Sequence, residues 1–143
     1  MAVNEDLFPE LSKEGYTITS DPDPGYNCIA WAAGFNDRFM DPADGYDWPS
    51  DLPKNHELDT LVMLYEGLGY DLCDDGNFEP EYEKVAIYGI GGEYEHATRQ
   101  LANGAWTSKL GLDDDIEHPR AESLAGDHYG PVVHYLKRRV LVG

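Results

Sequence analysis

The spacing of apolar residues predicts two helices in the first half of the chain. In segment 56–69 apolar side chains recur at every third or fourth position, which is typical of a helix with one buried face. These side chains are Leu58, Leu61, Val62, Tyr65 and Leu68. A shorter helix is predicted over 28–33, where almost every position is apolar, with Asn27 as its N-cap and Gly34 as its end. This shorter helix is expected to be buried on all sides.

Strands dominate the pattern in the second half. Apolar, β-branched and aromatic residues predict strands at 15–19, 84–89, 95–101, 105–111 and 129–140. The dipeptide Asn103-Gly104 predicts a hairpin between two of these strands. A short helix is expected at 121–125, and segment 35–53, rich in proline and aromatic residues, is expected to be an ordered loop. This order predicts an α+β fold, with N-terminal helices packed on a mostly antiparallel sheet.

Length and apolar runs limit the domain and membrane classes. At 143 residues the chain has the size of one domain, and we expect residues 1–143 to form a single domain. The longest apolar runs fall far short of the roughly 20 residues that a membrane helix needs, so no membrane partner is expected. The N-terminus has no basic segment followed by an apolar one, which predicts a cytoplasmic protein. An effector exported without a cleaved signal would share this feature.

The chain is strongly acidic. Its 28 Asp and Glu residues against 10 Lys and Arg residues give a formal net charge of −18, which repels phosphate backbones and argues against a nucleic-acid partner. Three explanations are compatible with this charge: a solvated acidic surface, adaptation to high salt, and mimicry of nucleic acid toward a basic protein partner. The acidic residues are dispersed along the whole chain, which favours the solvated surface.

The two cysteines, Cys28 and Cys73, limit the covalent and metal chemistry. One disulfide between them is compatible with the sequence, whereas a disulfide framework is not. Neither cysteine has the spacing of a zinc ligand, and no second histidine lies at ligand spacing from His118. We therefore expect no metal site and no cofactor, and we interpret Cys73 as a small buried hydrophobic residue.

Cys28 has the position of a catalytic nucleophile. It opens the predicted buried helix, where unpaired backbone N–H groups lower the pKa of a thiol and can hold the oxyanion of a tetrahedral intermediate. A histidine must then act as the base, and His96, near the start of a predicted strand, is the best placed of the five histidines. The alternative is that Cys28 packs in the core and that His96 is structural, as most such residues are.

Segments 16–34 and 84–111 resemble the papain-like cysteine hydrolases in their permuted, NlpC-type form. The residues Tyr26-Asn27-Cys28 look like the Tyr-Asp-Cys helix start of that family. His96 is followed by the same order of strand, hairpin and strand as in the family. The resemblance thus implies a papain-like layout of the α+β fold.

The same resemblance implies a thiol-dependent hydrolase acting on a peptide or another amide. It makes Cys28 the nucleophile, His96 the general base and Ser108 the third catalytic residue. Substrate or oxyanion contacts are expected from Tyr16, Asn27, Trp31, Trp106 and Lys109. A peptidase, a cell-wall amidase and a deamidase would use the same groups.

A non-enzymatic function is the alternative to the hydrolase. The family usually has His, Asn or Gln at the third catalytic position, whereas this chain has Ser108, which orients an imidazole less strongly. The chain would then be a catalytically inactive papain-like relative, or an acidic interaction or inhibitor protein that binds a basic partner. Binding of this second kind weakens steeply with added salt.

Overall fold

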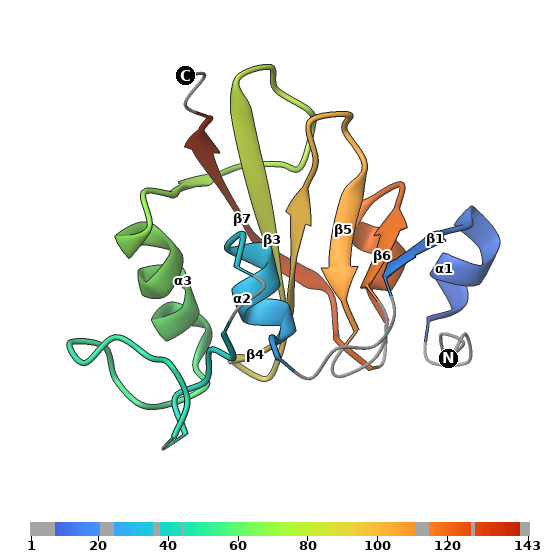
Figure 1. Ribbon diagram of the computed structural model, residues 1–143. Coiled ribbons are helices and arrows are strands. Elements are labelled where there is room, and N and C mark those ends of the chain that lie inside the picture. The colour runs from blue at the N-terminus through green and yellow to red at the C-terminus, as the bar shows by residue number, and fades with distance from the viewer. Residues whose placement is uncertain are drawn as a thin grey trace.

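The computed structural model describes residues 8–20, 25–35, 38–43, 45–110, 115–126 and 128–140. A seven-stranded sheet forms its centre, in the order β1-β6-β5-β4-β3-β7-β2, and every neighbouring pair is antiparallel (Figure 1). The strands are β1 (Thr17–Ser20), β2 (Asp71–Cys73), β3 (Tyr82–Ile90), β4 (Glu93–Gln100), β5 (Trp106–Lys109), β6 (Asp115–His118) and β7 (Val132–Arg139). The protein therefore has an α+β fold with an antiparallel sheet, as the sequence predicts.

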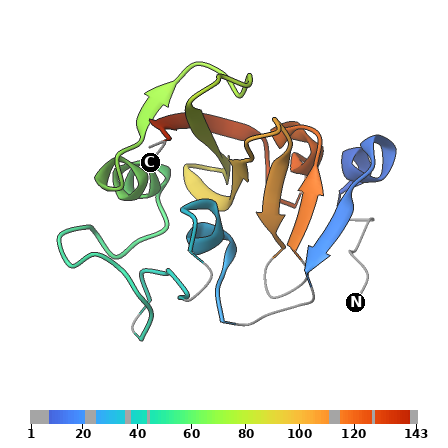
Figure 2. The ribbon, with the colours of Figure 1, turned by 45° about the horizontal axis from the view of Figure 1, so that its top comes forward.

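Short helices lie on both faces of this sheet. They are α1 (Pro9–Glu14), α2 (Cys28–Ala32), α3 (Leu58–Gly67) and the 3-10 helix η2 (Ala121–Leu124). Helices α2 and α3 cover one face, where Ile29 and Leu61 pack with Ile87 of β3 (Figures 1 and 2). Helices α1 and η2 lie on the other face, where Leu11 and Leu124 share a second core. The sheet thus separates two cores.

The structure confirms the helices predicted around residues 28–33 and 56–69 and the predicted strands, with boundaries that differ by a few residues. The structure also contains three elements that the sequence pattern did not predict: α1, β2 and β6. The Asn103-Gly104 hairpin joins β4 and β5, but the strands end at the pair Gln100–Trp106, so its loop spans 101–105 and is longer than two residues. Gly104 has φ +89°, the left-handed conformation that this turn requires.

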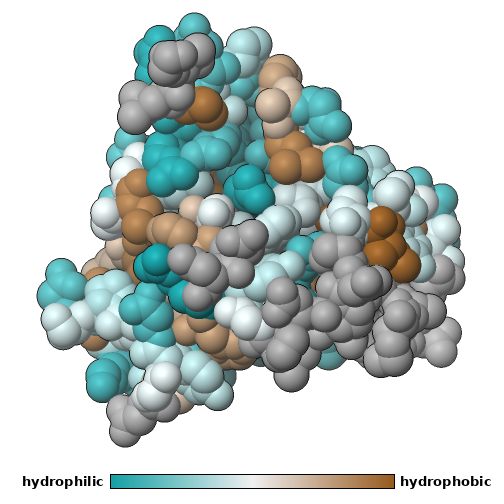
Figure 3. All heavy atoms as spheres, in the orientation of Figure 1, coloured by the Kyte–Doolittle hydropathy of each residue, from teal (hydrophilic) through white to brown (hydrophobic). Residues whose placement is uncertain are grey.

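One face of the molecule carries separate hydrophobic patches (Figure 3). On the face seen in Figure 3, hydrophobic residues form islands among hydrophilic ones. Large exposed apolar side chains include Tyr46, Met63, Leu72 and Phe78. Within the described stretches, no helix is long and apolar enough to cross a membrane.

Candidate functional site

Asn27 fixes the start of α2 and joins it to the loop that follows. Its Oδ1 accepts hydrogen bonds from the backbone N–H groups of Ala30 (3.2 Å) and Met40 (3.0 Å), and its Nδ2 donates to the carbonyl oxygen of Met40 (2.7 Å). Asn27 is therefore the N-cap that the sequence predicts. Cys28 follows as the first helical residue and is partly buried against the core beneath α2 and α3.

The Cys28 thiol is protonated at neutral pH. Burial raises its pKa to about 11, although the backbone N–H groups of Ala97, Ile29 and Cys28 itself act in the opposite direction. Because α2 has only five residues, its dipole does little to offset this burial. Desolvation therefore outweighs the activation that the helix start was expected to give.

His96 lies on the opposite face of the sheet from Cys28. Its ring stacks on Tyr129 at a centroid distance of 4.2 Å and lies 5.2 Å from the ring of Tyr88, and both tyrosines belong to the core beneath α1. The next residue of β4, Ala97, packs on the α2 side, because successive side chains of a strand point to opposite faces. The structure thus does not bring Cys28 and His96 together.

The His96 imidazole is a neutral, packed ring. It is fully buried, and neither ring nitrogen has a hydrogen-bond partner among the described residues. Burial lowers its pKa well below the usual 6.5. A general base must lie within hydrogen-bond reach of the proton that it removes, and in this structure His96 has aromatic neighbours instead.

Ser108 is hydrogen-bonded to His118 and not to His96. Its Oγ lies 2.8 Å from Nε2 of His118 and 2.6 Å from Oγ1 of Thr98. The other ring nitrogen, Nδ1, lies 2.8 Å from the carbonyl oxygen of Arg120, so Nδ1 carries the proton and donates. Burial lowers the pKa of His118 to about 4.

This buried polar chain is a site that the sequence interpretation missed. Thr98, Ser108 and His118 stand on three neighbouring strands of the sheet, and all three side chains are buried. Polar residues at inward positions of successive strands are the signal that could have revealed it, because buried polar groups need partners. The sequence alone does not show which positions point inward.

The remaining predicted contact residues are divided between the two faces. On the α2 side, Trp31 Nε1 donates to a hydroxyl group of β5 (3.1 Å), and the buried Lys109 ammonium lies 4.9 Å from the centre of the Tyr26 ring. On the other side, Tyr16 packs against the core beneath α1, and Trp106 lines a separate hollow. The predicted residues therefore do not converge on one site.

The structure places the two cysteines as free thiols, so the disulfide that the sequence left open is absent. Cys73 Sγ donates to the carbonyl oxygen of Asp75 (3.5 Å), and partial burial raises the pKa of its thiol. In the parts of the chain that the structure describes, no group of three or more His, Cys, Asp or Glu side chains could hold a metal ion.

A hollow between α3 and loop residues 38–43 and 45–53 is the candidate binding site. Its volume is about 370 Å³, and its walls are mostly apolar. The apolar side chains include Phe35, Met40, Trp48, Leu52, Met63 and Leu68. Charged groups at its edge are Arg38, Asp47 and Asp51. We call it the α3 hollow.

The loop wall of the α3 hollow is held in place by its own contacts. Trp48 Nε1 donates to the carbonyl oxygen of Pro53 (3.1 Å), and the backbone of Asp47 donates to that of Phe39 (3.0 Å). The Arg38 guanidinium lies 4.3 Å from the centre of the Phe35 ring and 3.4 Å from the Asp47 carboxylate. Arg38 and Asp47 therefore largely cancel each other in charge.

A model of one protein family matches residues 17–137, and its description is "Domain of unknown function (DUF7689)". The chain belongs to this family. Neither a curated protein nor a solved structure matches the chain. The DUF7689 match includes α2, α3, the α3 hollow and six complete strands, and it ends within β7.

Proposed function

We propose that this DUF7689 protein is a papain-like relative without a working Cys28–His96 centre and acts as an acidic interaction protein. The papain-like layout is supported by α2, which begins at Cys28 and packs on β4 and β5 of an antiparallel sheet. The inactive form is supported by the raised pKa of Cys28 and by the position of His96 in the other core.

The α3 hollow is the observation that carries the interaction proposal. Its apolar walls are open at the surface, where Met63 is 39% exposed. Covering such a wall with a partner's apolar side chain contributes about 25 cal/mol per Å² of apolar surface removed from water. An apolar anchor of the partner therefore occupies the hollow.

The charges around the α3 hollow determine the chemistry of that partner. Asp59 lies four positions before Met63 on α3, and Glu66 lies three positions after it. Both are exposed, and this spacing places them on the same helix face as Met63. Asp51 is exposed on the loop side. In a chain of net charge −18, these carboxylates favour a protein segment with basic residues beside its apolar anchor.

Calorimetry tests this function by measuring how tightly the protein binds a synthetic peptide with leucines and lysines at helical spacing. We expect Met63→Ser and Asp51→Asn each to weaken binding about fivefold, and a rise from about 50 to about 300 mM salt to weaken it further. Leu72→Ser and Asp71→Asn, exposed on β2, are the matched controls and should leave the affinity unchanged.

Two results would contradict the proposal. Equal weakening by the α3-hollow and β2 variants would mean that the peptide follows net charge rather than this hollow. Equal affinity for a peptide with glutamine at every lysine position would mean that the acidic groups do not select the partner.

A thiol-dependent hydrolase of peptide or other amide bonds is the second candidate, because His56 lies on the Cys28 side of the sheet. His56 Nε2 is 3.6 Å from the Asp41 carboxylate, and its ring is 5.4 Å from that of Tyr94. Tyr94 belongs to the same core as Cys28. Catalysis through this group requires an ionised thiol.

Alkylation by iodoacetamide at neutral pH separates the two candidates. With a thiol pKa of about 11, Cys28 should be labelled roughly a hundredfold more slowly than a model thiol, because only the thiolate reacts. Peptide mass spectrometry distinguishes Cys28 from Cys73, and labelling in urea, where both cysteines react freely, is the control. Rapid labelling of Cys28 in the folded protein would favour the hydrolase.

A further inference from the structure

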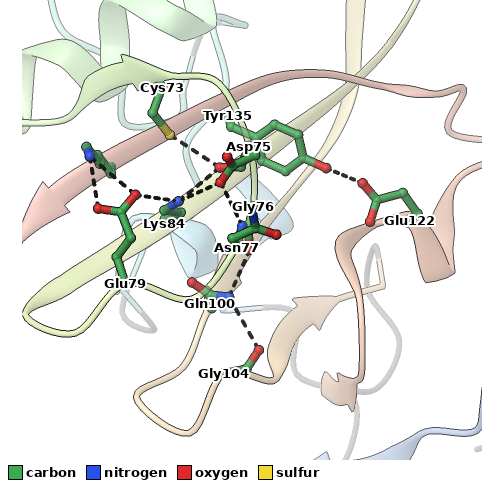
Figure 4. A network of polar contacts seen from close by, with 11 residues as sticks. Cys73, Asp75, Gly76, Asn77, Glu79, Lys84, Gln100, Gly104, Glu122 and Tyr135 are labelled. Carbon is green, nitrogen blue, oxygen red and sulfur yellow. Dashed lines mark hydrogen bonds and ion pairs between the residues drawn. The ribbon is translucent and has the colours of Figure 1, made fainter.

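A second hollow lies on the side of the sheet that carries η2, between η2 and the turn that follows β2 (Figure 4). Its volume is about 450 Å³. Carboxylates, an amide and aromatic rings line it, among them Asp75, Gln100, Trp106, Glu122 and Tyr135. We call it the η2 hollow. None of the groups proposed above for partner binding lies in it.

The turn at the edge of the η2 hollow is held by a buried lysine. Lys84 Nζ donates to the backbone oxygen of Asp75 (3.1 Å) and to its Oδ1 (3.2 Å), and it lies 2.9 Å from the Glu79 carboxylate (Figure 4). Asp75 Oδ1 also accepts the backbone N–H of Asn77 (3.0 Å). These bonds keep the pKa of Asp75 below its usual value, so the carboxylate is ionised.

Gly76 allows this turn to approach the aromatic wall. A Cβ at this position would lie 2.7 Å from the Tyr135 ring and 3.0 Å from the Trp106 ring. The turn and both rings are therefore in close contact, and the hollow is preformed.

The polar groups of the η2 hollow are mainly hydrogen-bond acceptors. Glu122 accepts the Tyr135 hydroxyl (Figure 4). Gln100 is only 5% exposed, and its Nε2 donates to the carbonyl oxygens of Gly76 (3.1 Å) and Gly104 (3.4 Å). Its Oε1 has no partner within the described residues. Through these two bonds Gln100 fixes Gly76 and Gly104, which line the hollow, relative to each other.

The cations near the η2 hollow are already bound. The Arg120 guanidinium, which lines the hollow, forms two bonds to the Glu14 carboxylate, at 2.9 and 2.7 Å, and lies 3.9 Å from the Glu122 carboxylate. Lys84 is buried behind Asp75 and is shared with Glu79. The hollow therefore attracts a positive charge rather than an anion.

We propose that the η2 hollow binds a primary alkylammonium group, from either a free polyamine or a lysine side chain. The ammonium donates to the Glu122 carboxylate, and the Asp75 carboxylate adds negative charge on the opposite side of the hollow. Its alkyl stem packs on the Tyr135 and Trp106 rings, whose faces also attract a cation. The proposal is independent of the partner assigned to the α3 hollow.

NMR titration of the whole protein with n-butylammonium chloride tests this site, with n-butanol as the neutral probe. We expect saturable shifts at Gly76, the Gln100 side chain and the Trp106 indole with the ammonium alone. Glu122→Gln should weaken binding about fivefold, because one charged acceptor is lost. Glu93→Gln, exposed at the β3–β4 turn, is the matched control and should have no effect.

Nα-acetyl-lysine amide in the same titration distinguishes the two sources. Binding about tenfold tighter than n-butylammonium would identify a lysine side chain of a protein, and equal binding would identify a free amine. Shifts dispersed over the surface, equal affinity for n-butanol, or the same loss in Glu122→Gln and Glu93→Gln would overturn the proposal.

Discussion

Two buried imidazoles connect the stability of the protein to pH. Burial lowers the pKa of His118 to about 4 and that of His96 well below 6.5, whereas both titrate near 6.5 in an unfolded chain. Between these values the unfolded state binds more protons than the folded state. The free energy of unfolding therefore has its full value above pH 6.5 and decreases as the pH falls toward 4.

Replacing His118 with glutamine should remove part of this dependence. Between about pH 7.5 and pH 4, His118 accounts for about 3 kcal/mol of lost stability, so the wild-type protein should lose that much more than His118→Gln. Urea unfolding at both pH values measures the difference. His128→Gln, at an exposed position, should keep the wild-type slope. A wild-type slope in His118→Gln would show that this ring does not cause the effect.

One irregularity in β4 places Tyr94 on the Cys28 side of the sheet, in the same core as Ala97. Tyr88 pairs with His96 but the next residue, Gly89, pairs with Tyr94, so Glu95 is passed over. Such a bulge reverses the alternation of faces. The sequence predicts the strand and its histidine from local patterns. It could not predict which face of the sheet each position occupies: His96 alternates regularly with Ala97 and points away from α2, so the predicted Cys28–His96 pair does not form.

At the scale of elements, Gly130 allows the segment before β7 to cross the end of β3. A Cβ on Gly130 would lie 2.4 Å from the Gly89 carbonyl oxygen and 2.5 Å from a side-chain carbon of Ile90. The Gly89 N–H also donates to the carbonyl oxygen of Pro131 (3.2 Å). The two backbones are therefore in direct contact.

Gly130→Ala should therefore destabilise the protein far more than Gly104→Ala. Both glycines have a positive φ, +78° and +89°, so both variants have similar backbone strain, about 1 kcal/mol. Only Gly130→Ala adds the steric clash, since the nearest atom to a Cβ at Gly104 is 3.8 Å away. We expect an additional loss of about 3 kcal/mol in urea unfolding. Equal losses in the two variants would mean that the backbone around Gly130 shifts and accommodates the added methyl group.

Local signals explain which elements the sequence could predict. Three signals act within a few residues of the chain, and each corresponds to an element of the structure. They are Asn27 before an apolar run, the apolar face of 58–67, and Asn103-Gly104. By contrast, β6 begins at Asp115 and has no apolar run, and it is a strand because β5 and β1 pair with it on both sides. Tertiary pairing of this kind is absent from the local pattern.

At the scale of the whole molecule, four of the ten basic residues lie on the paired strands β3 and β7. Lys137 lies 3.0 Å from Glu79, and the Arg139 guanidinium lies 3.1 Å from Glu81. Arg138 likewise bonds Glu83. Each of these ion pairs joins one acidic and one basic residue, so together they add no net charge. The net charge of −18 therefore comes from the acidic residues elsewhere in the chain. The sequence predicts this excess, but its distribution follows from strand pairing.

This excess predicts that salt stabilises the protein, because screening weakens the repulsion among carboxylates more than it weakens close ion pairs. From about 0.02 to about 0.5 M NaCl the Tm measured by calorimetry should rise by roughly 5 °C. Asp59→Lys and Glu66→Lys together change the charge by four units, from −18 to −14, at exposed positions of α3. The double variant should show a smaller rise with salt, since less repulsion is left to screen. A fall in Tm with salt would instead mean that the ion pairs between β3 and β7 dominate the electrostatic free energy, and the acidic surface would then cost the fold little.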